Sequence, residues 1–189
     1  HALVYSLLIG ERKPLQQGQL DIITAAGITG LDTLVTTLHP GVRALGASHR
    51  LPLLEMCLPA LKSMSAGQYR IFKDILVQLI RADHKTELHE WCLFQLVRHY
   101  LEPEFIRVRP SRSRYRKLKK VATPVQTVLS VLAYEGSGKS QATFRLGADT
   151  LGFTEMTILA REHANVEAFG LAVHELADCY PLQKPRLLK

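Results

Sequence analysis

Apolar residues recur at the spacing of helix faces along almost the whole chain, and strict alternation of apolar and polar positions never lasts more than a few residues. This pattern predicts an all-α protein, an irregular multi-helix bundle of short and medium antiparallel helices. Pro40 and Gly41 are expected to close the third helix, and Pro59 to kink the fourth. The helices predicted in the first half span residues 2–9, 19–26, 31–38, 52–62, 65–83 and 88–103.

Signals at helix starts support the two longest of these elements. Ser65 and Gln68 are spaced as a capping box, in which each side chain bonds a backbone amide that the helix leaves unpaired. Thr86 is expected to cap the following helix. Because the turn between these two amphipathic helices is short, we expect them to pack antiparallel.

A second capping-box spacing, from Thr123 to Gln126, restarts the helical pattern after a stretch that has no apolar face. Pro124 suits the first turn of that helix. Asn165 is expected to cap the last long helix, and Pro181 to follow its end. The elements predicted in the second half are helices over residues 124–134, 140–151 and 166–179, followed by an amphipathic tail over 182–189.

Composition and charge divide the chain further. Of its 189 residues 47% are hydrophobic and 22% charged, which suffices for one domain or two small ones with a buried core. The formal charge of +7 is concentrated in one basic strap, outside which 16 basic residues face 17 acidic ones. We interpret residues 105–121 as a linker between helical subdomains at 1–104 and 122–189, the second packed on the first. The eight basic residues of the strap are Arg107, Arg109, Arg112, Arg114, Arg116, Lys117, Lys119 and Lys120.

Three widely spaced cysteines, Cys57, Cys92 and Cys179, lie in apolar surroundings and indicate reduced core thiols in a cytoplasmic setting. Apolar runs are too short to cross a bilayer, which needs about 20 residues. Because the chain begins at His1 and enters an apolar segment at once, we interpret it as an excised domain, soluble as an isolated fragment, with His1 as a cloning remnant.

Two motifs resemble reaction or nucleotide sites but do not fit their spacing. The stretch 136–140, Gly-Ser-Gly-Lys-Ser, lacks the first glycine of a phosphate-binding loop, where Ala133 stands, and follows a predicted helix rather than a strand. His174 and Glu175 match the start of the zinc-peptidase signature, but Asp178 replaces its second histidine. An exposed helix face is the favoured interpretation of this second motif, and a hydrolase that uses these three residues is the alternative.

His89 and Glu90 also match the start of the zinc-peptidase signature, but Leu93 occupies the position of the second histidine, so an exposed helix face is again the favoured interpretation. The turn from Asp83 to Glu90 gathers carboxylate and imidazole groups between two helices, but it lacks the spacing of an EF-hand. We favour a helix cap with acidic residues at the positive end of the helix. The candidate cation contacts of this turn are Asp83, His84, Glu87 and Glu90.

The basic strap suits a negatively charged partner. Aromatic side chains are sparse around it, with only Phe105 and Tyr115 nearby, and this disfavours nucleic acid. A solvated linker is the simplest interpretation. If the strap binds a partner, an anionic membrane surface or an acidic protein fits it, because each lysine or arginine contributes about 1 kcal/mol near anionic lipid.

Several segments carry a family resemblance through their order along the chain. They are Arg50-Leu51-Pro52-Leu53-Leu54-Glu55, Leu58-Pro59-Ala60-Leu61-Lys62, Ser65, Gln68-Tyr69, Phe72, Leu79-Ile80-Arg81-Ala82-Asp83, Leu88-His89-Glu90-Trp91, Arg114-Tyr115-Arg116 and the tail over 182–189. This order resembles the C-terminal region of bacterial membrane-bound zinc metallopeptidases of the HtpX-like class, over nearly the whole chain. The turn at Asp83 also resembles TerB-like helical domains, in which an Asp-Gly turn and a later acid lie between paired helices, with His84 in place of the glycine.

In that family a His-Glu-x-x-His helix in a membrane-anchored peptidase domain binds zinc and carries proteolysis, and no segment of this sequence contains the complete motif. The resemblance therefore implies a non-catalytic C-terminal domain that regulates the peptidase or recruits its substrates or partners. It would have no cofactor of its own and would lie at the cytoplasmic face of the inner membrane. Its implied partner is the parent's own peptidase domain or that enzyme's substrate, with zinc expected in the peptidase domain. The alternative is a free-standing helical interaction domain unrelated to proteolysis.

Overall fold

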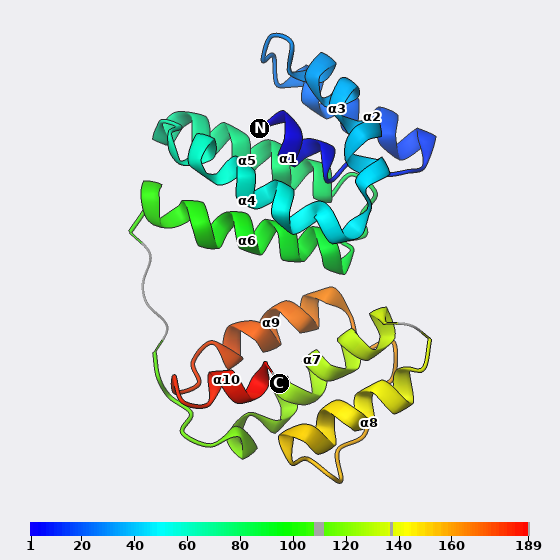
Figure 1. The fold of residues 1–189 in the computed structure, drawn as a ribbon, viewed down its shortest axis with the longest axis vertical. Coiled ribbons are helices and arrows are strands. Elements are labelled where there is room, and N and C mark those ends of the chain that lie inside the picture. Colours follow the sequence, from blue (N-terminus) through cyan, green and yellow to red (C-terminus); the bar gives the residue numbers. More distant parts are fainter. Residues whose placement is uncertain (108–111, 137, 189) are drawn as a thin grey trace. The chain divides into compact units, whose positions relative to one another are not determined.

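A computed structural model describes residues 1–107, 112–136 and 138–188 (Figure 1). It confirms the all-α prediction. The described residues form ten α-helices and two short 3-10 helices, joined by turns and irregular segments, and include a single β-bridge between Tyr115 and Cys179. The chain divides into two compact units, unit 1 (His1–Val108) and unit 2 (Arg109–Lys189). None of the described helices is long and apolar enough to cross a membrane.

Unit 1 is organised around its short first helix. Helix α1 packs mainly against α3 and α4, while α5 packs against α2 and α6. The helices of this unit are α1 (Ala2–Ser6), α2 (Lys13–Ala25), α3 (Leu31–Leu45), η1 (Ala47–His49), α4 (Arg50–Lys62), α5 (Ala66–Ile80) and α6 (Leu88–Phe105).

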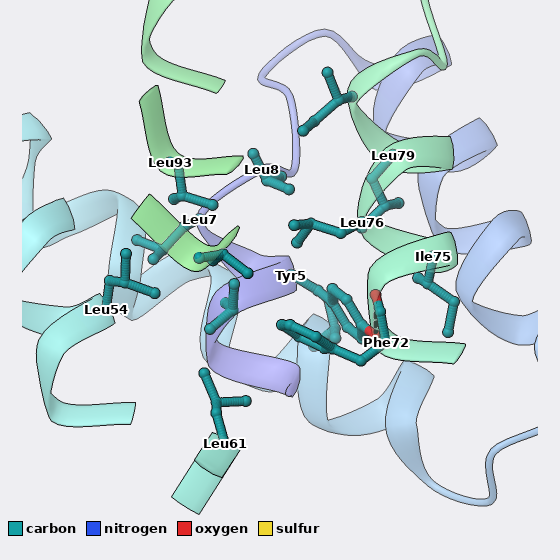
Figure 2. Packing of buried hydrophobic residues seen from close by; sticks show 14 of the residues in the cluster. Tyr5, Leu7, Leu8, Leu54, Leu61, Phe72, Ile75, Leu76, Leu79 and Leu93 are labelled. Carbon is teal, nitrogen blue, oxygen red and sulfur yellow. Dashed lines mark hydrogen bonds between the residues drawn. The ribbon is translucent and has the colours of Figure 1, made fainter. Parts of the chain in front are cut away.

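The core of unit 1 surrounds α1 and the turn after it. In Figure 2, Tyr5 lies beside Phe72 of α5, and Leu7 and Leu8 point toward leucines of the surrounding helices. The two aromatic rings are 5.4 Å apart, and the Tyr5 hydroxyl donates to the Phe72 carbonyl at 3.3 Å. Leu76, also on α5, is fully buried. A five-residue helix has little stability of its own, so burial in this core holds α1 in place.

Gln19 is a fully buried polar residue that joins three segments of unit 1. Its amide oxygen accepts from the Gly10 amide at 2.7 Å. Its amide nitrogen donates to the carbonyls of Leu8 at 2.9 Å and Leu79 at 3.1 Å. One side chain on α2 thus ties the turn after α1 to the end of α5, and these backbone groups have a partner where water is excluded.

Unit 2 is built on α7, which packs against α8 and α9. Gln126, Ser130 and Tyr134 lie at successive turns of α7 and bond the backbone of the irregular segment between α8 and α9. Gln126 donates to the Thr157 carbonyl at 2.7 Å, and Ser130 and Tyr134 bond the amide and carbonyl of Leu159 at 3.0 and 2.7 Å. The helices of this unit are η2 (Leu118–Val121), α7 (Ala122–Glu135), α8 (Ser140–Leu151), α9 (Val166–Leu176) and α10 (Lys184–Leu187).

Two of the predicted helix caps are present. The Gln68 backbone amide donates to the Ser65 hydroxyl at 3.2 Å, and the Ser65 backbone amide donates to the side-chain oxygen of Gln68 at 2.8 Å. These two hydrogen bonds confirm the capping box. The Asn165 side chain accepts from the Ala168 amide at 2.9 Å.

Two other predicted caps are wrong. Helix α6 is capped at Glu87 rather than at Thr86, and the Glu90 carboxylate accepts from the Glu87 amide at 2.9 Å. Helix α7 begins at Ala122, directly after η2, so Thr123 already lies inside the helix. The Gln126 side chain donates instead to the Thr157 carbonyl, in the segment between α8 and α9.

The third helix is longer than predicted, because α3 continues through Pro40 to Leu45. His39 is buried and bonds the Ser6 carbonyl at 3.3 Å, and Val42 packs on the core. Pro40 is exposed, so the carbonyl that it leaves without an amide partner can meet water. Continued burial of one face thus outweighs the local cost of the proline.

The ends of the predicted linker at 105–121 belong to the two units. Phe105 closes α6 and stacks on Tyr69 at a centroid distance of 4.4 Å. Leu118 and Val121, spaced one 3-10 turn apart, are buried in the core of unit 2. The expectation that the strap has no apolar face is therefore wrong at its C-terminal end.

Candidate functional site

The turn between α5 and α6 does not assemble the predicted cation contacts. Asp83 is engaged by Arg12 at 3.3 Å and by the Lys85 amide at 3.1 Å. His84 has a φ of 58°, which suits a tight turn, and is exposed. Glu87 pairs with His89 at 3.1 Å. Among the described residues no group of three or more metal-ligating side chains is placed to hold an ion, so the four candidates are not brought together.

Glu90 is the chemically unusual residue of this turn. Its carboxylate is buried at the start of α6, and burial raises its pKa to about 7. The hydrogen bond from the Glu87 backbone amide lowers this pKa in part. The charges of Glu87 and Asp83 raise the pKa further, and the charge of Arg50 lowers it. The arrangement is a helix cap whose charge changes near neutral pH, and it supplies no cluster of ligands.

The zinc-peptidase-like motif on α9 serves as the attachment point of the basic strap. Glu175 accepts from the Tyr115 hydroxyl at 3.1 Å, and His174 is exposed. The Asp178 carboxylate accepts from the Arg112 amide at 2.9 Å and pairs with the Arg114 guanidinium at 3.3 Å. Both acidic residues therefore have strap residues as partners.

Beyond Asp178, the strap continues beside the end of the chain. Tyr115 forms the bridge with Cys179, and the Tyr180 amide donates to the Tyr115 carbonyl at 3.0 Å. The Arg116 guanidinium lies over the Tyr180 ring at 5.2 Å and bonds its hydroxyl at 3.1 Å. Sequence analysis missed this docking, although complementary charges on the strap and on the end of α9 were its signal.

The other strap residues fall into three groups. Arg107 follows α6 in unit 1 and is exposed, and Arg109 lies outside the described residues. Lys117, Lys119 and Lys120 are exposed around η2. Of the eight predicted contacts, the described ones from Arg112 onward therefore lie in unit 2, on a strap that is bonded to Glu175 and Asp178.

Unit 1 contains a charge cluster that the sequence analysis did not identify. Glu102 is buried and accepts from Lys73 at 2.6 Å and from Arg98 at 2.9 and 3.1 Å. Burial alone would raise the pKa of Glu102, but these two cations outweigh it and hold that pKa below its ordinary value. The cluster joins α5 to α6, and its only sequence signal is the spacing of Arg98 and Glu102 by one helical turn.

Helix α3 presents an uncharged apolar face. Leu34, Leu38 and Leu45 are 56%, 37% and 48% exposed and lie along one side of the helix. The adjoining side of the helix is buried through Leu31 and Val35. No charged residue occurs between Thr33 and Val42, so this face is suited to contact with another apolar surface.

Unit 2 also has an open groove of about 460 Å³, lined by Lys119, Gln126 and the loop over residues 152–157. It contains one lysine and one glutamate, Glu155, and therefore favours neither anions nor cations.

Comparison with protein-family models, with curated proteins and with solved structures finds no match to this chain. Its function has to be inferred from its own residues.

Proposed function

We propose that this chain is a non-catalytic helical domain of a bacterial membrane-anchored zinc metallopeptidase, where it positions the peptidase domain or recruits its substrates. The resemblance described above, which spans nearly the whole chain, supports this assignment. The carrying observation is that Glu175 and Asp178, the acids of the zinc-peptidase-like motif at 174–178, bind the strap instead. Zinc and proteolysis then belong to the peptidase domain of the parent protein.

The exposed face of α3 supports protein binding as the role of unit 1. Three leucines along one helix face, of which Leu34 and Leu38 have no charged residue between them, suit a helix or groove of a partner protein. The same face also favours the second candidate, a helical interaction domain unrelated to proteolysis, because it requires no peptidase.

The coding sequence upstream of this chain separates the two candidates. The metallopeptidase assignment requires hydrophobic spans and a His-Glu-x-x-His motif there, and a reading frame without them contradicts it.

A binding measurement then tests the α3 face. With the parent's purified peptidase domain as ligand, Leu34→Ser combined with Leu38→Ser should weaken binding at least tenfold, because two exposed leucines are removed from the contact. Leu171→Ser, at a leucine of unit 2 that is 70% exposed, is the matched control and should leave binding unchanged. Equal binding by both variants contradicts a role for α3.

A further inference from the structure

The strap and the last residues of the described chain together form one surface of unit 2, which carries basic side chains and exposed leucines. The two segments are joined by the Tyr115–Cys179 bridge and by the contacts of Arg116 with Tyr180. Leu118 of η2 and Leu187 of α10 pack in the same hydrophobic cluster. The strap and the tail therefore lie in the same region of the unit (Figure 1).

The strap supplies three of the cations on this surface. Because the 3-10 turn buries Leu118 and Val121, Lys119 and Lys120 point outward, and Lys117 is exposed beside them. Within the described residues none of these three lysines has an acidic partner, whereas Arg114 is paired with Asp178. The strap therefore presents positive charge that the described part of unit 2 does not neutralise.

The tail adds two cations and two leucines. Lys184 and Arg186 lie on α10, between Leu182 and Leu188 in the sequence. These leucines are 86% and 88% exposed, more than any other large apolar side chain of the described residues. Leu187, which lies between Arg186 and Leu188 in the sequence, packs against the hydrophobic cluster of unit 2. The tail is therefore anchored, while Leu182 and Leu188 remain in water.

We infer that this part of unit 2, the tail–strap surface, docks on an anionic phospholipid bilayer. Its members are Lys117, Lys119, Lys120, Lys184, Arg186, Leu182 and Leu188. The cations meet lipid phosphates, and the leucines enter the boundary between headgroups and acyl chains. The inference does not depend on the metallopeptidase assignment, because any parent protein that works beside a membrane could use this surface.

A bilayer fits this surface better than nucleic acid does. Binding of single strands relies on aromatic rings that stack on bases. Here Tyr115 bonds Glu175 through its hydroxyl, and the ring of Tyr180 is covered by Arg116. The two exposed leucines gain nothing from a phosphate backbone, whereas a bilayer removes their side chains from water.

Vesicle sedimentation of the whole chain tests this inference. The chain should sediment with vesicles of equal parts phosphatidylcholine and phosphatidylglycerol, but not with vesicles of phosphatidylcholine alone. Binding should weaken as salt rises, because salt screens the attraction between exposed charges. Equal sedimentation with both vesicle types, or none with either, overturns the inference.

Matched variants separate the charged and apolar contributions. Lys119→Glu combined with Lys120→Glu should weaken binding at least 25-fold, at roughly fivefold for each lysine lost. Leu182→Ser should weaken it roughly tenfold while leaving its salt dependence unchanged. The controls are Lys139→Glu and Leu146→Ser, at an exposed lysine and a 71% exposed leucine elsewhere in unit 2.

Both controls should retain binding, and all variants should keep the circular dichroism spectrum of the parent chain because every altered residue is exposed. Losses in the controls equal to those in the test variants overturn the inference. Binding to soluble polyglutamate that is as strong as binding to vesicles, and unaffected by Leu182→Ser, would assign the surface to an acidic protein instead and overturn it too.

Discussion

Replacing Gln19 with leucine should destabilise unit 1 by about 3–5 kcal/mol. The substitution removes three hydrogen bonds, of which those to the Leu8 and Leu79 carbonyls are buried and that from the Gly10 amide is partly buried. Each contributes about 1 kcal/mol, and a buried backbone group left without a partner costs about 1–3 kcal/mol. Leucine returns part of this through apolar burial, which leaves a net loss within the stated range.

Urea unfolding followed by tryptophan fluorescence measures this loss in unit 1 alone. The chain has one tryptophan, Trp91, and it lies on α6. Gln17→Leu is the control, two positions earlier on the same helix, where the exposed side chain bonds only Asp21. It should change the free energy of unfolding by less than about 0.5 kcal/mol. A loss below about 1 kcal/mol for Gln19→Leu would refute the reasoning.

Three further predictions concern pH, strap docking and the thiols. The folded-state pKa of Glu90, about 7, exceeds its ordinary value of 4.5, so the stability this carboxyl contributes below pH 4.5 is lost as pH rises to 7. Glu90→Gln should therefore stabilise unit 1 by about 1–3 kcal/mol at pH 8 and have little effect at pH 4, and equal effects at both pH values contradict this. Asp178→Ala should speed tryptic cleavage at Arg114 and Arg116, with Glu167→Ala as control, and an unchanged rate would mean that Asp178 does not hold the strap. Burial raises the pKa of all three thiols, so iodoacetamide should label them more slowly than free cysteine near neutral pH, and labelling at the free rate contradicts their burial.

Sequence patterns predict most of the helices because a long helix buries an apolar face, although α2 begins at Lys13 rather than at residue 19. The caps were less predictable, since a cap depends on what else competes for the side chain. Ser65 is exposed and bonds only its own helix, so its motif predicts its contact. Gln126 has the same spacing from Thr123, but its side-chain amide donates to a carbonyl 31 positions later in the sequence. No local pattern contains that information.

The candidate site was harder to predict than the fold for a related reason. Asp178 was weighed as a metal ligand on the basis of neighbours along α9, whereas its partners come from the strap, 66 positions earlier. The sequence predicts an amphipathic tail and a basic strap, but their placement in one region rests on contacts between distant segments, the bridge of Tyr115 with Cys179 and the cluster that contains Leu118 and Leu187. Contacts between segments distant in sequence decide which charges are satisfied and which remain free.

The polar stripe on α7 has a consequence for how unit 2 would be monitored in solution. Gln126, Ser130 and Tyr134 hold a non-helical segment, with Ser130 fully buried. If that segment came away, the helices themselves could persist, and far-ultraviolet circular dichroism would register almost nothing. Amide hydrogen exchange at Leu159, whose N–H is bonded to Ser130, would report the opening directly.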